Sequence, residues 1–374
     1  MESTTIEQEI AKRLLVEGAT LIFLNVPVGS KFGIDMKTWD TGEKFKGIKM
    51  IPPGLHMIHY SAVGKFEQVA PRVSFIHNFQ KGEFVVKKWD VDAEDMSTEM
   101  ISEAEMERLK SNLCYLDQFL GVYPFDIFPL WRSLSNYITE PLVKQLSPEC
   151  GLIRSALELV ADEHQTVKDS RRVQRKTLEE KEEDLLPHLK PRPGTGLRLT
   201  SVPEKGYPDG CSPQEMTKHS LDLTYSLEHM INEAGGMSHL VGEIQFSFLC
   251  FLLGHSLEAL ESWKNLVKVL CNCREALTTK KHLYKMFLKA FEAQLDQVPM
   301  DFLVDIVASN NVIYTSLREL FRTIEESEDI CRTLRYDVEK MKQTVSEKFS
   351  WDFTNLELED EDEAPVIVEL AGQV

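Results

Sequence analysis

The sequence predicts an α+β protein, in which a β-rich, sandwich-like N-terminal domain precedes an all-α domain and an extended C-terminal tail. Three observations predict this order. Short runs rich in β-branched and aromatic residues, separated by Gly and Pro, fill about the first ninety residues. Apolar residues then recur at helical spacing from about residue 212 to about residue 350. The remaining residues combine a run of acids with a short β-forming segment. We therefore expect an N-terminal domain with trailing helices at 1–162, a linker at 163–211, a helical domain at 212–350 and a tail at 351–374.

The strand predictions rest on runs bounded by Gly and Pro. The four clearest runs are 20–26, 55–60, 73–79 and 83–89. Lys81 and Gly82 separate the last two runs, which predicts a hairpin turn. Apolar and polar residues alternate imperfectly in these runs, which indicates that both faces of the sheet are partly covered.

The period of the apolar residues changes near residue 102. Ser102 and Glu105 form a capping-box pattern, and apolar residues follow at helical spacing as far as Leu120, which predicts one helix. A shorter helix is predicted to begin at Thr139, because Pro141 falls in its first turn.

The segment 163–211 has the composition of an interdomain linker. A basic stretch (168–176) runs into an acidic one (179–184), and six prolines follow within 27 residues. No continuous helix or central strand tolerates so many prolines. The basic stretch has two interpretations, a contact with RNA or a solvated helix face, and the acids behind it favour the solvated helix.

The C-terminal half is predicted to be almost entirely helical. Ser212, Pro213 and Glu215 supply an N-cap, a first-turn proline and a capping-box partner. Apolar spacing predicts helices near 213–233, 238–253, 256–273, 275–296, 300–309, 311–325 and 327–348. Short connections between them are typical of a layered or solenoid-like helical domain.

Composition and charge narrow the functional classes. Lys plus Arg number 42 against 60 Asp plus Glu, so the formal net charge is −18, and direct nucleic-acid binding would require a local basic patch. No apolar run approaches the roughly 18 residues that a membrane span needs, and the first fifteen residues lack the pattern of a secretory leader. Seven scattered cysteines, with no Asn-x-Ser/Thr site, favour a reduced, intracellular protein.

Motifs that carry catalytic chemistry are missing from the sequence. It contains no phosphate-binding loop, no nucleophile elbow and no His-Glu-x-x-His. His56 and His59 fall three apart on a predicted strand and should point to opposite faces; together with His77 they give only a weak hint of a metal site. Cys271 and Cys273 are expected to be small buried apolar residues. We therefore expect no enzyme activity, no cofactor and no metal.

The tail has a distinctive pattern. Trp351-Asp352-Phe353 leads into six acids within residues 357–363, and the β-forming residues 364–370 follow. In a strand, Val366, Val368 and Leu370 would line one face, and Ile367 and Glu369 the other. Such an isolated strand can pair with a partner's sheet, pair with an edge of its own N-terminal sheet, or stay disordered; we favour the partner. The acidic residues within 357–363 either steer the protein toward a basic partner surface or act as a solubilising spacer.

Distinctive blocks of residues are spread in one order over most of the chain. They comprise residues 32–35, Trp39, Gly42, Phe45, 47–54, His56, 59–61, 116–121, 217–223, 243–254, 301–307, 351–353 and 364–370. In this order they resemble the AAR2 splicing-factor family. The region 163–210 departs from the family's pattern in length and composition, so its contacts do not follow from the resemblance.

The resemblance implies a non-enzymatic assembly chaperone of the U5 small nuclear ribonucleoprotein, found in cytoplasm and nucleus. Members of the family bind the central U5 protein Prp8 at its RNase H-like and Jab/MPN domains, and so delay engagement of the helicase and of RNA. The resemblance also implies a helical domain similar to a VHS module. It further implies a C-terminal strand that bridges the two Prp8 domains, which here corresponds to Val366, Ile367, Val368, Glu369 and Leu370.

Two other functions compete with this one. The first is a helical adaptor of tetratricopeptide type, whose tail would pair with its own sheet. The second is an enzyme built on the β-rich domain, which would use His56, His59 or His77. Protected tail amides in the isolated protein would favour the adaptor, and stoichiometric metal would favour the enzyme.

Overall fold

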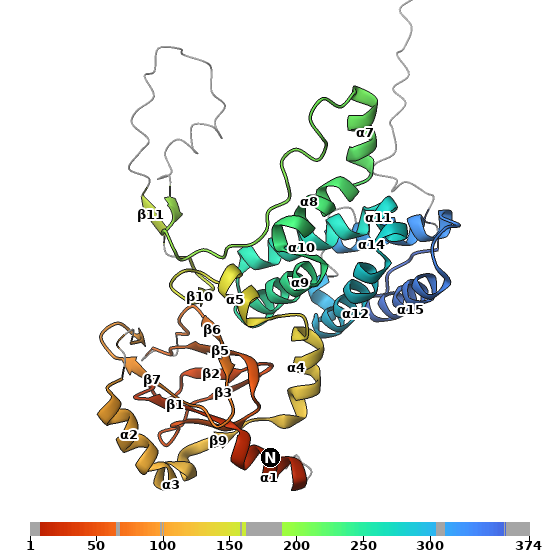
Figure 1. Ribbon diagram of the computed structural model, residues 1–374. Helices are drawn as coiled ribbons and strands as arrows, with labels where there is room; N and C mark the ends of the chain where they lie inside the picture. Colours follow the sequence, from red (N-terminus) through yellow and green to blue (C-terminus); the bar gives the residue numbers. More distant parts are fainter. Residues whose placement is uncertain are drawn as a thin grey trace, which may run out of the picture. The chain divides into compact units, whose positions relative to one another are not determined.

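The computed structural model describes residues 8–64, 68–97, 99, 101–157, 159–161, 189–303, 311–354 and 356. Its contacts divide the chain into two compact units (Figure 1). The first unit comprises Met1–Trp131, Thr139–Arg198 and Cys250–Glu258, and the second comprises Arg132–Ile138, Leu199–Leu249 and Ala259–Val374. Two five-stranded sheets belong to the first unit, and most helices belong to the second. The predicted α+β class is confirmed.

Two sheets, the first mixed and the second antiparallel, form the centre of the first unit. One has the strand order β8-β7-β1-β4-β9 and the other the order β10-β6-β5-β2-β3. The strands are β1 (Ala19–Leu24), β2 (Lys31–Ile34), β3 (Lys37–Asp40), β4 (Gly47–Ile51), β5 (Gly54–Ser61), β6 (Val73–Phe79), β7 (Phe84–Asp90), β8 (Asp95–Met96), β9 (Leu120–Val122) and β10 (Ile153–Arg154). β1 runs antiparallel to β4 and parallel to β7, and β9 runs parallel to β4.

The two sheets share one apolar core. Leu21 and Phe23 of the first sheet lie in the same buried cluster as Phe32, Ile58 and Phe75 of the second, as in a β-sandwich. The other face of the first sheet is covered as well. Its residues there pack against a helical segment through Met106, Leu109 and Leu113. Because both faces of β1 are covered, its residues show no clean alternation of buried and exposed positions.

The predicted hairpin at Lys81 and Gly82 is wrong. β6 and β7 have the predicted bounds to within a residue, but they belong to different sheets. Both edges of β6 are occupied, by β5 and β10, and both edges of β7 are occupied, by β1 and β8. Gly82, with φ 63°, therefore turns the chain from one sheet to the other.

The single helix predicted as far as Leu120 is also wrong. The chain forms α2 (Glu103–Ser111), α3 (Leu113–Leu116) and the 3₁₀ turn η1 (Asp117–Phe119) before it enters β9. Ser102 does cap α2, since its hydroxyl accepts the N–H of Glu105 at 3.2 Å. The apolar spacing persists across the first break because α2 and α3 both pack against the same sheet through Met106, Leu109 and Leu113 (Figure 1).

Further helices and a short ladder complete the first unit and the segments around it. These are α1 (Gln8–Glu17), the 3₁₀ turn η2 (Phe125–Ile127), α4 (Phe128–Ser135), α5 (Glu140–Leu146), β11 (Leu159–Ala161) and β12 (Leu189–Pro191). Thr139 caps α5 as predicted, with proline in the first turn. β11 and β12 pair with each other in antiparallel fashion, a pairing that the sequence had not indicated.

The helices of the C-terminal half follow the predicted order with four differences. They are α7 (Pro213–Leu221), α8 (Thr224–Ala234), α9 (Met237–Leu252), α10 (Leu257–Cys271), α11 (Arg274–Thr279), α12 (Lys281–Gln297), α13 (Met300–Leu303), α14 (Val312–Glu326) and α15 (Arg332–Phe349). The capping box of Ser212 and Glu215 is confirmed in both directions. The helix predicted over 213–233 breaks at Asp222, and the one over 275–296 breaks at Lys280. The last helix begins at Arg332 instead of residue 327, and of the helix predicted over 300–309 only α13 falls in the described residues.

Asp222 explains the first of these breaks. Its Oδ1 accepts the N–H of Thr224 at 3.0 Å, which starts α8, and its Oδ2 accepts the N–H of Glu275 at 3.0 Å, which starts α11. One carboxylate thus accepts first-turn N–H groups of two helices, and the more remote donor, Glu275, lies 53 residues from Asp222 in sequence. The apolar stretch 244–253 lies mostly within α9 and is largely buried, as predicted. Among the described helices, none combines the length and the apolar composition that crossing a membrane would require.

Candidate functional site

The predicted partner-binding residues Val366, Ile367, Val368, Glu369 and Leu370 lie outside the described residues. The described part of the tail is its beginning, residues 351–354 and Leu356, which we call the tail root. The tail root follows α15 directly. Ser350, in a left-handed conformation with φ 56°, ends that helix and redirects the chain.

Aromatic side chains hold the tail root on the helical unit. The Phe353 ring is 2% exposed; it stacks on Tyr314 of α14 at 5.2 Å and meets Phe321 edge-on at 4.9 Å. Trp351 stacks on Phe349 at 4.7 Å. Aromatic pairs in these arrangements contribute about 0.5–1.5 kcal/mol each beyond their buried area.

Hydrogen bonds fix the backbone of the tail root. The Tyr314 hydroxyl donates to the carbonyl of Asp352 at 2.9 Å, and the Asp352 carboxylate accepts the N–H of Thr354 at 2.9 Å. Hydrogen bonds from the Thr354 side chain and backbone hold the pKa of Asp352 below its usual value. Leu356 is only 5% exposed. The tail therefore leaves the helical unit from a fixed point, and residue 366 lies at most about 35 Å from it, at 3.3–3.6 Å per residue.

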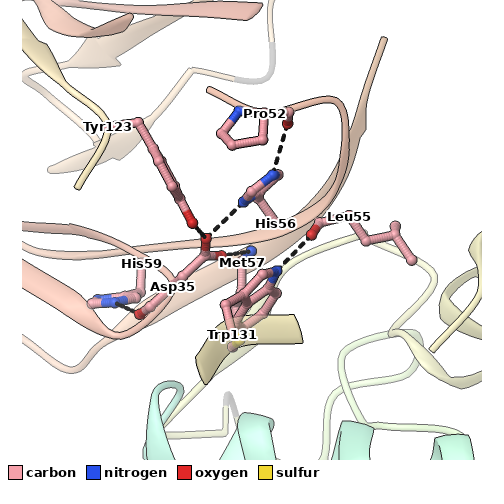
Figure 2. Close-up of polar contacts among 8 residues, drawn as sticks. All are labelled: Asp35, Pro52, Leu55, His56, Met57, His59, Tyr123 and Trp131. Carbon is pink, nitrogen blue, oxygen red and sulfur yellow. Dashed lines mark hydrogen bonds and ion pairs between the residues drawn. The ribbon is translucent and has the colours of Figure 1, made fainter. Parts of the chain in front are cut away.

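A network of buried hydrogen bonds lies inside the sandwich and centres on Asp35 (Figure 2). Its Oδ2 accepts the Tyr123 hydroxyl at 2.6 Å and lies 2.6 Å from Nδ1 of His56. Its Oδ1 accepts the N–H of Met57 at 3.0 Å. Asp35 and His56 are both shielded from solvent. Burial and the nearby Asp35 charge raise the pKa of Tyr123 above its usual value, so this hydroxyl remains a donor.

Local sequence places Asp35 there. β2 and β3 pair with Ile34 opposite Lys37, so Asp35 and Met36 form a two-residue hairpin loop. Asp35 has φ 52°, a left-handed conformation that Asp tolerates better than most residues. The conformation of this turn directs the Asp35 carboxylate into the interior of the sandwich.

The three histidines that gave a weak hint of a metal site all have polar partners. Both ring nitrogens of His56 face oxygen acceptors, because Nε2 lies 2.8 Å from the Pro52 carbonyl and Nδ1 faces Asp35. His59 uses Nε2 to donate to the Asp35 carbonyl at 3.1 Å. His77 is partly exposed and lies 3.1 Å from Glu83 instead. The structure thus brings His56 and His59 to the same residue, Asp35, whereas His77 lies opposite His56 on β6 and contacts Glu83 instead.

Burial also sets the protonation of His59. Desolvation, together with the nearby Arg72 guanidinium, lowers its pKa from 6.5 to about 4. Its Nδ1 is buried and has no hydrogen-bond partner among the described residues. The ring lies directly over Gly33, where an added Cβ would come within 2.0 Å of it, so only glycine leaves space for His59. In the described part of the chain, no three His, Cys, Asp or Glu side chains are grouped in a way that could hold a metal ion.

Cys271 and Cys273 are fully buried, as predicted. Burial raises the pKa of both thiols well above the usual value. The Cys273 Sγ donates to the Val269 carbonyl at 2.9 Å, a contact with the last turn of α10. Both residues contribute to the apolar core of the helical unit.

Sequence reasoning did not single out Asp35, Tyr123 or Tyr314. Asp35 could have been found from its place between two short β-forming runs, since Asp is favoured in such turns. Tyr123 and Tyr314 carry no comparable signal, because their partners are remote in sequence.

Comparison with known proteins gives a consistent result over both halves. Residues 17–148 match the model of the AAR2 N-terminal domain, and residues 199–354 match that of the AAR2 C-terminal repeat region. A relative named Protein AAR2 homolog, from Homo sapiens, is 40% identical over 381 residues and covers 99% of this chain and 98% of its own. The Mus musculus protein of that name is 38% identical with the same coverage. The Caenorhabditis elegans protein is 33% identical over 361 residues, covering 92% of this chain and 97% of its own. Since the similarity extends over both units and nearly the full length, this chain belongs to the AAR2 family.

Proposed function

We propose that this protein is a non-catalytic assembly factor of the U5 small nuclear ribonucleoprotein and acts in pre-mRNA splicing. The observation that carries the proposal is family membership over nearly the whole length of the chain. Its principal partner is Prp8, bound at the RNase H-like and Jab/MPN domains, and other U5 proteins assemble around that complex. The protein works in cytoplasm and nucleus, without a cofactor and without direct contact to nucleic acid or membrane.

The mechanism is steric and competitive. While the protein occupies its surface on Prp8, the helicase and RNA cannot engage there. Residues 366–370 add a strand to the partner's sheet, with Val366, Val368 and Leu370 as side-chain anchors. Backbone hydrogen bonds each contribute roughly 0.5–1.5 kcal/mol, whereas ordering a residue costs about 1–2 kcal/mol. A free peptide would therefore bind weakly.

The tail root supports this mechanism. Because Phe353 and Leu356 are buried on the helical unit, any contact made by the folded units raises the effective concentration of the strand at its receiving edge. A tether of about 35 Å keeps that concentration in the millimolar range.

The engaged histidines argue against the competing enzyme. Each ring nitrogen of His56 already faces an oxygen, and the His56–Asp35 pair is closed to solvent. No single observation favours the adaptor, whose tail would pair with its own sheet.

Calorimetric titration into the C-terminal region of Prp8 tests the proposal. The full chain is compared with a truncation after Leu356, which keeps the tail root, and with Val368→Pro, which removes one backbone donor from the strand. Gln373→Pro, beyond the strand, is the matched control. We expect tight binding by the full chain and the control, and a loss of tenfold or more, about 1.4 kcal/mol, in the truncation and in Val368→Pro.

The outcomes separate the parts of the proposal. Equal binding by all four proteins would place the interface on the folded units and refute strand addition. Absence of binding by the full chain would refute the Prp8 partnership and leave the adaptor. Cell fractionation that finds the protein in neither cytoplasm nor nucleus would contradict the proposed location.

A further inference from the structure

The helix pair α12 and α15 carries an unusual row of cations. The two helices pack side by side in the helical unit (Figure 1). Lys281, Lys285 and Lys289 are all exposed and lie at intervals of four residues, which places them on one face of α12. Among the described residues, no carboxylate lies within ion-pair distance of any of the three. We call these three side chains the lysine row.

The lysine row contrasts with its surroundings. Two cations of α15 do have carboxylate partners: Lys340 pairs with Glu292 at 3.0 Å, and Lys342 with Glu325 at 2.8 Å. Like charges four residues apart on a helix are destabilising. A chain with a net charge of −18 therefore leaves a row of positive charges unpaired within its folded, described part.

Two contacts and one electrostatic effect show that α12 and α15 run parallel. Near the start of both helices, hydrogen bonds from Thr333 and Leu334, together with the charges of Lys281 and Lys285, lower the pKa of Cys331. Further along, Glu292 pairs with Lys340. At the end, the Lys348 ammonium donates to the carbonyl of Leu295 at 2.6 Å. The lysine row thus lies beside the first half of α15, and the tail root follows its last turn.

The acidic segment 357–363 matches the lysine row in spacing. In an extended chain, alternate residues point the same way and repeat about every 6.8 Å, so Glu359, Glu361 and Glu363 would form one line of carboxylates. On α12, residues four apart repeat about every 6 Å along the axis. The two charge rows therefore stay in register over three pairs.

The acidic segment also has a length comparable to the distance along α12 that it would have to span. Lys289 and Lys285 lie roughly 18 and 24 Å back from the C-terminal end of α15, at 1.5 Å per residue. Glu361 and Glu363 can reach about 17 and 24 Å from Leu356. Lys281, about one turn further, comes within the additional length of its own side chain.

We propose that in the free protein the acidic segment 357–363 lies back along Lys281, Lys285 and Lys289. The folded unit holds its own tail in this way, and a partner that uses the tail first has to displace it. The contact is a property of the isolated chain and does not depend on Prp8.

Nuclear magnetic resonance of the uniformly ¹⁵N-labelled full chain tests this inference. The amide signals of residues 357–363 are compared between the natural protein and K281E/K285E/K289E at about 0.1 M salt. The control K44E/K110E/K268E changes three exposed lysines elsewhere and has the same net charge. Since only exposed side chains change, every variant should fold. The amide signals of the helical unit check that it does.

We expect the tail signals to shift in the lysine-row variant and to stay in place in the control. In the natural protein, about 1 M salt, which shortens the Debye length from about 10 to about 3 Å, should move them to the positions seen in the variant. Combining E359K/E361K/E363K with K281E/K285E/K289E should restore their dependence on salt, because the pairing is then reversed.

Two results would overturn the inference. Tail signals that coincide in the natural protein and the lysine-row variant at low salt would show that the tail does not lie on the row. Binding of single-stranded oligouridylate to the lysine row, with the tail signals unchanged, would assign this surface to nucleic acid instead.

Discussion

Tyr123 donates its hydroxyl to Asp35 at 2.6 Å, across 88 residues of sequence, and shares that carboxylate oxygen with His56. The contact ties the segment after β9 to the turn between β2 and β3. Since β9 belongs to one sheet and this turn to the other, a single buried carboxylate links both layers of the sandwich. The first prediction follows from this contact.

Tyr123→Phe should lower the free energy of unfolding by about 1.5–3 kcal/mol, because it removes a hydrogen bond to a buried carboxylate and keeps the ring. Asp35→Ala should cost more, about 3–5 kcal/mol, since it leaves both His56 and Tyr123 without their partner. Urea denaturation followed by near-ultraviolet circular dichroism measures both. Tyr115→Phe, on a side chain that is 66% exposed, is the control and should change nothing. Equal stability of Tyr123→Phe and the natural protein would show that the contact contributes no net stability.

His59 should make the protein sensitive to acid. Its pKa is 6.5 in the unfolded chain and about 4 in the folded one, so the unfolded state binds more protons between these values. Stability is therefore complete above about pH 6.5 and falls as the pH drops toward 4, by about 3 kcal/mol in total. His59→Gln, which cannot titrate, should flatten this part of the profile, whatever its stability at neutral pH. The exposed His282→Gln serves as control, and an unchanged slope in His59→Gln would rule out His59 as its source.

Phe353→Ala should destabilise the helical unit by about 3–5 kcal/mol, because it empties the site between Tyr314 and Phe321. Trp351→Ala should cost less, since that side chain is only partly buried. Thermal unfolding gives the order of the two effects. Limited proteolysis is the second measurement. Of the two variants, only Phe353→Ala should be cleaved upstream of residue 356. A larger effect for Trp351→Ala would mean that the tail root is held mainly by Trp351.

Asp222→Ala should cost about 2 kcal/mol, roughly twice the usual value for one cap, because it uncaps both α8 and α11. Ser212→Ala removes the cap of α7, a helix that buries none of its residues, and should cost about 1 kcal/mol or less. Hydrogen exchange should show faster exchange in the first turns of α8 and α11 only in Asp222→Ala. Protection of the first turn of α11 in that variant would contradict the double cap.

Local signals in the sequence were sufficient for much of the fold. Ser102, Thr139 and Ser212 cap helices where predicted, because a capping hydrogen bond spans only three residues. The strands β5, β6 and β7 lie within a residue of their predicted bounds, since each is enclosed by turn-forming residues. The residue blocks that resemble the AAR2 family also led to the family that the full-length comparison shows.

The tertiary structure decided what depends on remote partners. β7 pairs with the open edge of β1, a strand about sixty residues earlier in the chain. The short turn at Gly82 therefore could not indicate the pairing partner of β7. The helix after Ser102 ends early because Leu120 is needed as a strand beside β4. The Asp35 network and the tail root each join side chains at least 21 residues apart. The sequence by itself thus determined the elements, their caps and the family. Only packing determined their partners, because hydrogen bonds and apolar contacts between distant segments form once the chain has folded and leave no periodic trace in the sequence.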